Sequence, residues 1–280
     1  NSLTKSAYYE KHGFNSEASV AMLNPLSQDL GVLRQSMLFG GLEALEYNSK
    51  RQRPNLKFYE FGRVYKQAEN AYGESEKLSL WLSGLSEEEN WRDGARPSSF
   101  YEIKNALTLC FDRLGMGPAQ ESATSDPIFS EGLHWHRGPK TIAQLGMVSK
   151  SILKEFDLKV PVYYAELNWS ELVKAGRKKQ IAMEDLPRFP EVRRDLALLV
   201  DSSILYADLE KAALRSGGKI LKAVNLFDVY EGKNLPAGKK SYALSFTFAH
   251  AEKTLNDKEI EKLMAKILAN LEKQCGASLR

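Results

Sequence analysis

Cysteine is scarce in this chain. Its 280 residues contain two cysteines, Cys110 and Cys275, which stand far apart. Two isolated thiols provide neither a disulfide framework nor the paired spacing of a structural zinc site. They are typical of a protein in a reducing compartment, and we expect a cytoplasmic location. Cys110 falls on the apolar side of an expected helix, so we interpret it as a packing residue.

Long hydrophobic runs are also lacking. No apolar stretch approaches the roughly 18 residues that a membrane-spanning helix needs, so we expect no membrane association. The first residues, Asn1 to Lys5, include no Met and lack the layout of a signal peptide. We therefore expect the chain to begin inside a longer protein or after a tag. Its composition is that of a globular protein, and its length suffices for two domains.

The familiar signatures of catalysis are missing. Gly40-Gly41 is not followed by Gly-Lys-Ser/Thr, and neither a Gly-x-Gly-x-x-Gly nor a Gly-x-Ser-x-Gly motif occurs. His134 and His136 could form half of a metal site, but no further His or Cys cluster supplies the other ligands. We interpret them as loop histidines. The sequence thus offers no catalytic residue and no metal ligand set.

Positive charge is in small excess and is unevenly placed. The chain has 39 Lys and Arg against 36 Asp and Glu. From Asp185 onward the counts are 16 and 13, so the last third carries the whole excess. An excess of three permits nucleic-acid binding but does not by itself indicate it.

The last third has the pattern β-α-β-β-α-β. The expected elements are a strand with Leu196, Leu198 and Val200 on one face, a helix over 206–215, strands over 221–230 and 241–249, a helix that begins with a capping box at Thr254, and a strand over 277–279. In the 241–249 strand, Tyr242, Leu244, Phe246 and Phe248 alternate with Ser241, Ala243, Ser245 and Thr247. This order predicts an antiparallel sheet with both helices on one face. The other face would be free to meet a flat, charged partner such as RNA.

The first two thirds read as a larger α+β module. We expect a helical segment over 16–48 interrupted at Asn24-Pro25, a strand over 56–66, a polar loop over 67–77, a strand over 78–85, a helix over 100–114, strands over 141–148 and 162–167, and a strap between domains over 176–190. Within the helical segment, apolar residues recur at spacings of three and four.

The segment from Leu56 to Lys66 resembles the first strand of motif 2 in class II aminoacyl-tRNA synthetases. In that family a strand–loop–strand hairpin presents an arginine to the α-phosphate of ATP, where a planar guanidinium is needed. Lys66 stands at the corresponding place here. The glycines and arginine of motif 3 are also missing near 164–170. The resemblance therefore implies a synthetase-like fold without its catalytic groups.

The chain as a whole resembles the C-terminal part of the β subunit of bacterial phenylalanyl-tRNA synthetase. The resemblance is carried, in order, by Leu23-Asn-Pro-Leu26, Leu33-Arg34, Phe58-Tyr-Glu-Phe-Gly-Arg-Val-Tyr65, Trp91, Phe100-Tyr101, Phe189-Pro190, Arg194-Asp-Leu-Ala197, Leu226-Phe-Asp-Val-Tyr230, Gly238-Lys-Lys-Ser241 and Thr254-Leu255. The region of His134 to Arg137 departs from the His-Pro-Gly-Arg usual in the family.

This resemblance implies an α+β fold in two domains. Residues 1–184 would be a non-catalytic module with the antiparallel sheet of a class II synthetase, and residues 185–280 a ferredoxin-fold anticodon-binding domain. The family enzyme is an (αβ)₂ heterotetramer that charges tRNA(Phe) with ATP and Mg²⁺. The fragment itself would hold no cofactor, and its partners would be the catalytic α subunit and the anticodon region of tRNA(Phe). The family's editing domain and N-terminal tRNA-binding domain have no counterpart in these residues.

Two sets of site residues follow as predictions. An apolar stripe is expected to divide between the module's own core and the α subunit: Leu33, Met37, Leu38, Leu42 and Leu45. The alternative is that the whole stripe is internal core. In the C-terminal module the expected phosphate contacts are Arg188, Arg193, Arg194, Lys233, Lys239 and Lys240, and the expected base-stacking residues are Phe189 and Tyr230. The alternative is a structural Arg194–Asp195 ion pair with solvated lysines.

Two other functions stay open at this stage. The chain could be a regulatory paralogue of a class II synthetase whose partner is an enzyme, although such a protein has no need of an anticodon module. It could also be a free-standing enzyme with an unrecognised site, against which the missing motifs argue.

Overall fold

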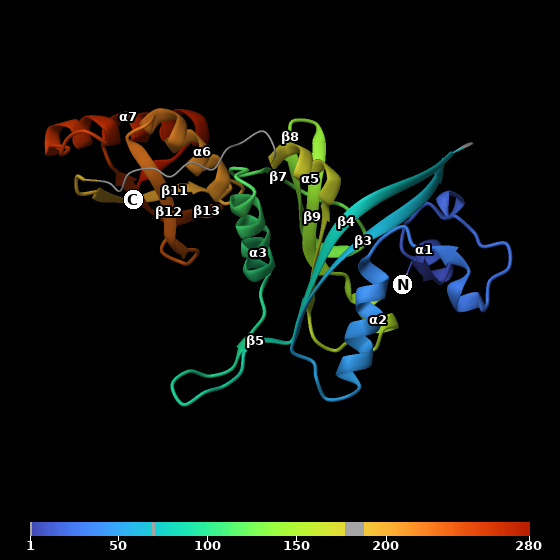
Figure 1. The fold of residues 1–280 in the computed structure, drawn as a ribbon. Helices are drawn as coiled ribbons and strands as arrows, with labels where there is room; N and C mark the ends of the chain where they lie inside the picture. The colour runs from blue at the N-terminus through green and yellow to red at the C-terminus, as the bar shows by residue number, and fades with distance from the viewer. Residues whose placement is uncertain (1, 69–70, 177–187) are drawn as a thin grey trace. The chain divides into compact units, whose positions relative to one another are not determined.

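The computed structural model describes residues 2–68, 71–176 and 188–280. The chain forms two compact units, Asn1–Ala182 and Met183–Arg280, called here unit 1 and unit 2 (Figure 1). Each unit encloses hydrophobic clusters of its own. The predicted boundary at 184/185 and most of the predicted strap lie outside the described residues, so the boundary stays a prediction.

Unit 1 is an α+β unit built on an antiparallel sheet. Its elements are β1 (Leu3–Thr4), α1 (Ala7–Lys11), the 3-10 turns η1 (Ser16–Ala18) and η2 (Gln28–Leu30), β2 (Val32–Leu33), α2 (Leu38–Ser49), β3 (Leu56–Ala68), β4 (Ala71–Ser83), β5 (Leu85–Glu87), β6 (Arg96–Pro97), α3 (Phe100–Arg113), β7 (Gln120–Ala123), β8 (Phe129–Arg137), β9 (Lys140–Val148), α4 (Lys150–Glu155), β10 (Val162–Asn168) and α5 (Trp169–Gly176). The main sheet has the order β3-β4-β10-β9-β8-β7 within the described residues.

Helices cover both faces of this sheet, as Figure 1 shows for α2 and α3. On the α2 face, Leu42 packs with Trp81 and Tyr164, and the Trp81 indole N–H donates to the Leu38 carbonyl at 3.3 Å. On the α3 face, Leu107 packs with Leu145 and other strand residues. Because strand side chains alternate between faces, β4 contributes to both clusters.

The α3 helix forms as its sequence predicts. Ile103, Leu107 and Phe111 recur every fourth residue and are all buried. The Glu102 carboxylate accepts a hydrogen bond from the Ser99 backbone N–H at 3.2 Å, which satisfies one of the free donors at the helix start.

The predicted helical segment over 16–48 is wrong before Met37. Val32–Leu33 is a strand, β2, which pairs antiparallel with β1, and the helix α2 begins only at Leu38. Leu33 therefore stands at a helical spacing from Met37 without lying in a helix. Pairing with β1 holds Val32 and Leu33 in an extended conformation, and the residues before them form the 3-10 turns η1 and η2 and the bends between these turns.

The predicted polar loop over 67–77 is also wrong. Most of it belongs to β4, which pairs with β3 from Leu56↔Ser83 to Ala68↔Ala71. Arg63 lies within 3.3 Å of Glu74 and 3.5 Å of Glu76, so opposite charges face each other across this polar hairpin. Strand β8 was not predicted, and it includes His134 and His136, which are therefore strand and not loop residues.

Unit 2 has the predicted β-α-β-β-α-β order. Its elements are β11 (Val192–Asp201), α6 (Tyr206–Gly217), β12 (Leu221–Tyr230), β13 (Lys239–Phe248), α7 (Asp257–Cys275) and β14 (Ser278–Leu279). The strands are antiparallel in the order β12-β13-β11-β14 among the described residues. Tyr242, Leu244, Phe246 and Phe248 of β13 pack with residues of α6 and α7 in one cluster, so both helices cover the same face.

Helix α7 begins two residues later than predicted. The Asn256 side chain accepts from the Glu259 N–H at 2.9 Å, and the Glu259 carboxylate accepts from the Asn256 N–H at 3.3 Å. The capping box thus belongs to Asn256 and not to Thr254. At the other end Gly276 has a φ of 60°, the left-handed conformation that glycine adopts without strain.

Candidate nucleic-acid interface

The face of the unit 2 sheet opposite its helices is called here the open face. Residues paired across antiparallel strands project to the same side, so the register defines this face. Its rows are Ala223–Thr247–Arg193, Asn225–Ser245–Asp195, Asp228–Ala243–Ala197 and Tyr230–Ser241–Leu199. The central strand contributes Ser241, Ala243, Ser245 and Thr247, called here the floor. The predicted division of β13 into a core face and a small, polar face is confirmed.

An arginine of β11 and a phenylalanine of β12 meet across β13 on the open face. The Arg193 guanidinium lies 5.4 Å from the centroid of the Phe227 ring. Its Nε and Nη2 donate to the Asp195 carboxylate at 2.9 and 3.3 Å, which holds the guanidinium in place. Phe227 is 50 % exposed and lies where the β12 register shifts between Leu226 and Asp228.

A second arginine–aromatic pair includes Tyr230, the last residue of β12. The Arg280 guanidinium is 4.9 Å from the centroid of the Tyr230 ring. The Arg280 N–H donates to the Ala197 carbonyl at 3.0 Å, which continues the pairing with β11 beyond β14. Tyr230 was predicted as a base-stacking residue, whereas Phe227 and Arg280 were missed. The adjacent apolar residues Leu226 and Phe227 break the alternation and were a signal that one of them faces outward.

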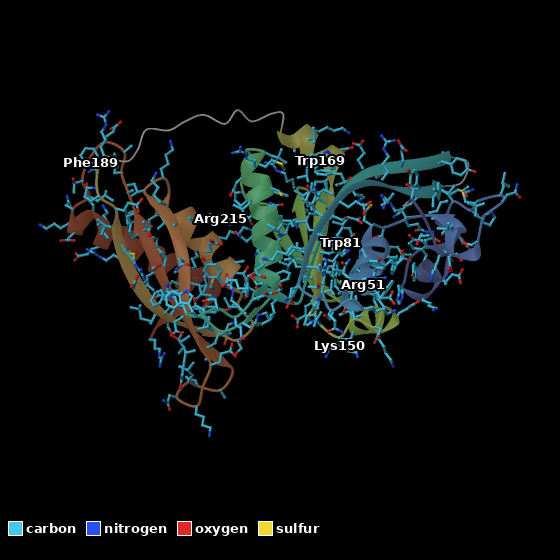
Figure 2. All side chains as sticks on the ribbon, turned by 60° about the horizontal axis from the view of Figure 1, so that its bottom comes forward. Arg51, Trp81, Lys150, Trp169, Phe189 and Arg215 are labelled. Carbon is cyan, nitrogen blue, oxygen red and sulfur yellow. The ribbon has the colours of Figure 1, made fainter. Side chains whose placement is uncertain are left out.

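The predicted basic residues at the borders of the open face differ in their surroundings. Lys239 pairs with Asp201 at 2.8 Å, while Lys233 is exposed and has no ion-pair partner among the described residues. Arg188 is exposed and Phe189 half-buried just before β11, and Figure 2 labels Phe189.

Two of the residues predicted to contact phosphate project to the helical side of the sheet. Lys240 is only 7 % exposed, because its register partner is Val200 and its side chain turns to the helical face, with Nζ 4.9 Å from the Tyr242 ring centroid. Arg194 also projects to the helical side and pairs with Asp257 at 2.7 Å, tying β11 to the start of α7. The alternative from the sequence was an ion pair between Arg194 and Asp195. In the structure Asp195 pairs with Arg193 instead.

In unit 1 the predicted interface stripe is enclosed. Met37, Leu38, Leu42 and Leu45 are buried in the unit's own core, and Leu33 is half-buried in β2. The four buried side chains present no surface to another chain, which is the internal-core alternative. Unit 1 instead exposes other large apolar side chains, among them Leu23 at 98 %, Trp91 at 95 % and Leu26 at 94 %.

No cluster of three or more His, Cys, Asp or Glu side chains that could hold a metal ion occurs among the described residues. His134 Nε2 lies 3.0 Å from the Thr124 hydroxyl, and His136 Nδ1 lies 3.2 Å from the Gly138 carbonyl oxygen. Of the helices within 2–68, 71–176 and 188–280, none is long and apolar enough to cross a membrane.

Two known protein families match successive parts of the chain, one in each unit. The family described as "Phenylalanyl tRNA synthetase beta chain CLM domain" matches residues 1–169. The chain belongs to this family. The family described as "Ferredoxin-fold anticodon binding domain" matches residues 187–280, which include the open face. The resemblance inferred from the sequence, and the α+β fold with a ferredoxin-like second part, are confirmed.

Curated relatives cover the whole chain or nearly so. The phenylalanine–tRNA ligase β subunit of Bacteroides fragilis is 44 % identical over 100 % of this chain, and that of Geobacillus kaustophilus is 36 % identical over 100 %. That of Thermotoga maritima is 32 % identical over 93 % of this chain. The chain spans only 36 %, 35 % and 33 % of these relatives' lengths. Among solved structures, the pyrrolysyl-tRNA synthetase of Desulfitobacterium hafniense aligns over 62 % of this chain and 60 % of its own with a TM-score of 0.47 and 12 % identity, a likeness too weak to support an inference.

Proposed function

We propose that this chain is part of the β subunit of a cytoplasmic phenylalanine–tRNA ligase, in which unit 2 binds the anticodon region of tRNA(Phe). The observation that carries the proposal is the open face, with its two arginine–aromatic pairs, inside a region that matches the anticodon-binding family. Relatives named as the β subunit of this ligase support the reaction class. The chemistry, with ATP and Mg²⁺, is assigned to a catalytic α subunit in an (αβ)₂ assembly, and no catalytic residue is assigned to this chain.

The open face supplies the two kinds of contact that single-stranded RNA needs. Loop bases are read unstacked and are commonly bound on aromatic rings or guanidinium planes. Phe227 and Tyr230 provide rings, and Arg193 and Arg280 provide guanidinium groups beside them. The floor beneath these pairs has short side chains, of which Ser241 and Ser245 are only 3 % and 4 % exposed. Of the predicted phosphate contacts, Lys233 and Arg188 keep that role, since they are exposed.

Binding of a fluorescent anticodon stem-loop of tRNA(Phe), followed by anisotropy at several salt concentrations, tests this proposal. Phe227→Ala should weaken binding about tenfold or more, since a stacked base contributes about 1–3 kcal/mol and 1.4 kcal/mol is a factor of ten. Lys233→Met should instead reduce the slope of log affinity against log salt by about one. Tyr101→Ala, which removes an exposed aromatic ring from α3 of unit 1, is the matched control and should change neither quantity.

The result also separates the rival readings. A chain that binds no RNA at low salt, or that binds equally well after Phe227→Ala and Lys233→Met, would contradict the assignment of the open face. A regulatory paralogue with an enzyme partner predicts the first of these outcomes.

For unit 1 we propose a scaffolding role towards the α subunit. The buried leucines of α2 cannot make this contact directly, so the exposed Leu23 and Leu26 are its better candidates. They lie between Met22 and Gly31. The Met22 N–H donates to the Gly31 carbonyl at 2.9 Å, which joins the two ends of this segment. Obligate subunit interfaces bury about 2,000 Å² or more of largely apolar surface, and side chains of this kind supply it.

Co-purification with the α subunit of the same organism tests the scaffold. Leu23→Asp combined with Leu26→Asp should reduce the yield of complex without changing the thermal stability of the chain alone, because both side chains are solvent-exposed. Leu109→Asp, a change at an exposed leucine of α3, is the control. A folded chain that forms no complex would refute the scaffolding role.

A further inference from the structure

A polar pocket of about 590 Å³ lies in unit 1, on the α2 face of the sheet. Residues of strands β3, β4, β9 and β10 and of the segments 13–18 and 35–36 line it. This volume falls within the range of small-molecule sites in proteins, about 300–1,000 Å³. Nothing in the proposed binding of RNA or of an α subunit uses it.

A buried carboxylate organises the base of the pocket. Glu166 is 7 % exposed, and its Oε2 accepts from the Tyr164 hydroxyl at 2.7 Å and from the Ser36 hydroxyl and the Met37 N–H at 3.2 Å each. Burial, together with the Glu166 charge, raises the pKa of Tyr164 well above its ordinary value, so the phenol keeps its proton and donates it. The other carboxylate oxygen lies 3.4 Å from Lys77 Nζ. Both oxygens of Glu166 are thus already engaged.

Several polar groups of the pocket are not engaged. Gln35 is 4 % exposed, and its Nε2 donates to the Asn15 carbonyl at 2.9 Å and the Ser19 hydroxyl at 2.7 Å. Its Oε1 has no hydrogen-bond partner among the described residues, and this atom is not fully buried. The side chains of Gln144 and Asn168 also line the pocket without a hydrogen-bond partner in the part of the chain described.

Two lysines and two carboxylates line the pocket, and the lysines keep free donors. The Asp126 Oδ1 accepts from the Ile128 N–H at 3.1 Å in a turn, and Glu166 pairs with Lys77. The Lys77 ammonium group has three N–H donors. One of them is directed to Glu166, and the other two are available to a ligand. Lys66 has no ion-pair partner among the described residues. A ligand that satisfies these groups carries an anion for the two lysines and polar atoms for the amides.

We infer that this pocket binds a small polar metabolite through a carboxylate or phosphate group held by Lys66 and Lys77. Gln35, Gln144 and Asn168 contact its hydroxyl or amino groups. Charge-assisted hydrogen bonds to an oxyanion are the strong contacts of such a site. Phe14 and Val64 also line the pocket and would contact an apolar part of the ligand.

Two substitutions isolate the pocket without disturbing its base. Lys66→Met removes an exposed ammonium group. Gly73→Leu places a side chain beside Lys66, its partner in the β3–β4 register, and a Cβ there meets only the Lys66 carbonyl oxygen at 3.7 Å, an ordinary contact. Lys57→Met is the matched control, because Lys57 is an exposed lysine of the same strand that projects to the opposite face.

Isothermal titration and two-dimensional NMR of the 280-residue chain test the inference with four probes. L-Serine and L-phenylalanine are the carboxylate arm, and AMP and inorganic phosphate are the phosphate arm, so the responding arm identifies the source of the anion. We expect saturable binding of at least one probe, with shifts at Gln35, Gln144 and Asn168. Lys66→Met should weaken it about tenfold, the factor that corresponds to 1.4 kcal/mol. Gly73→Leu should abolish it, and Lys57→Met should leave it unchanged.

The opposite results would overturn the inference. If none of the probes binds at 10 mM, or if Lys57→Met weakens binding as much as Lys66→Met, the lysines are only solvated and the Lys77–Glu166 pair is only structural. Thermal unfolding of each variant shows that lost binding does not come from lost folding. Binding that survives Gly73→Leu would place the ligand elsewhere and would likewise refute the site.

Discussion

Adjacent glycines in α2 offer a sharp test of how unit 1 is packed. Gly40 and Gly41 follow one another in the same helix, but only Gly41 faces the sheet. A Cβ added at Gly41 would lie 2.0 Å from Trp81 Cε2 and 2.3 Å from its Nε1, whereas one added at Gly40 has nothing within 4 Å. Trp81 is 1 % exposed. Figure 2 labels Trp81 in this packed region.

Gly41→Ala should destabilise unit 1 by about 1–3 kcal/mol. Overpacking a core typically costs about 1–3 kcal/mol, and moving Trp81 would also break its hydrogen bond to the Leu38 carbonyl, which contributes about 1 kcal/mol. Alanine regains about 1 kcal/mol through its higher helix propensity. Gly40→Ala keeps only that gain and should stabilise unit 1 by about 0.5–1 kcal/mol.

Urea unfolding of both variants, followed by tryptophan fluorescence and far-UV circular dichroism, measures the two effects. Because the chain has two units, the comparison uses the shift of the unit 1 transition and not a single two-state fit. The reasoning is refuted if Gly41→Ala is as stable as the parent, or if Gly40→Ala is destabilised to the same extent. Either result would mean that α2 does not sit against Trp81 as described.

Three further outcomes are expected. Asn256→Ala should destabilise unit 2 by about 1 kcal/mol, measured by urea unfolding, because it removes the cap of α7. Burial raises the pKa of Glu155, but the hydrogen bonds from His12 and Lys11 outweigh it and the net pKa is lowered from 4.5. Glu155→Gln should therefore cost stability at pH 7, and this difference from the parent should vanish as the pH falls below 4.5 through the folded-state pKa. A difference that grows on acidification would contradict this sign. Burial raises the pKa of both cysteines, and Cys275 is buried whereas Cys110 is half-buried, so Ellman's reagent at pH 8 should modify Cys110 first.

Local alternation in the sequence was enough to predict the faces of β13. Tyr242, Leu244, Phe246 and Phe248 occupy one side of a strand wherever its neighbours lie, because side chains alternate at every residue. The same alternation places Lys240 on the Tyr242 side, which the predicted phosphate contact overlooked because it considered charge without face. Alternation from Val224 and Leu226 also places Phe227 outward, whereas the pairing of Asp228 with Ala243 depends on a register shift that only the structure reveals.

Helical spacing was less reliable in unit 1. Leu33 stands four residues before Met37, a helical spacing, yet it lies in a two-residue strand held by β1, a partner about thirty residues away in the sequence. The polar start of β4 was predicted as a loop for the converse reason. Its residues lack strand propensity, and pairing with β3, including the contacts of Glu74 and Glu76 with Arg63, makes them a strand. Non-local pairing decided both cases.

The floor of the open face also affects which side chains lose conformational entropy when a partner binds. Ser241, Ala243, Ser245 and Thr247 have short side chains with little rotamer freedom, whereas immobilising a lysine or arginine costs up to about 2 kcal/mol in entropy. Asp195 already restrains Arg193, and the strand backbone fixes the floor. A base that stacks on Phe227 or Tyr230 would thus meet a surface that is partly ordered beforehand, and the entropic penalty of binding would fall mainly on Lys233, Arg188 and the RNA itself.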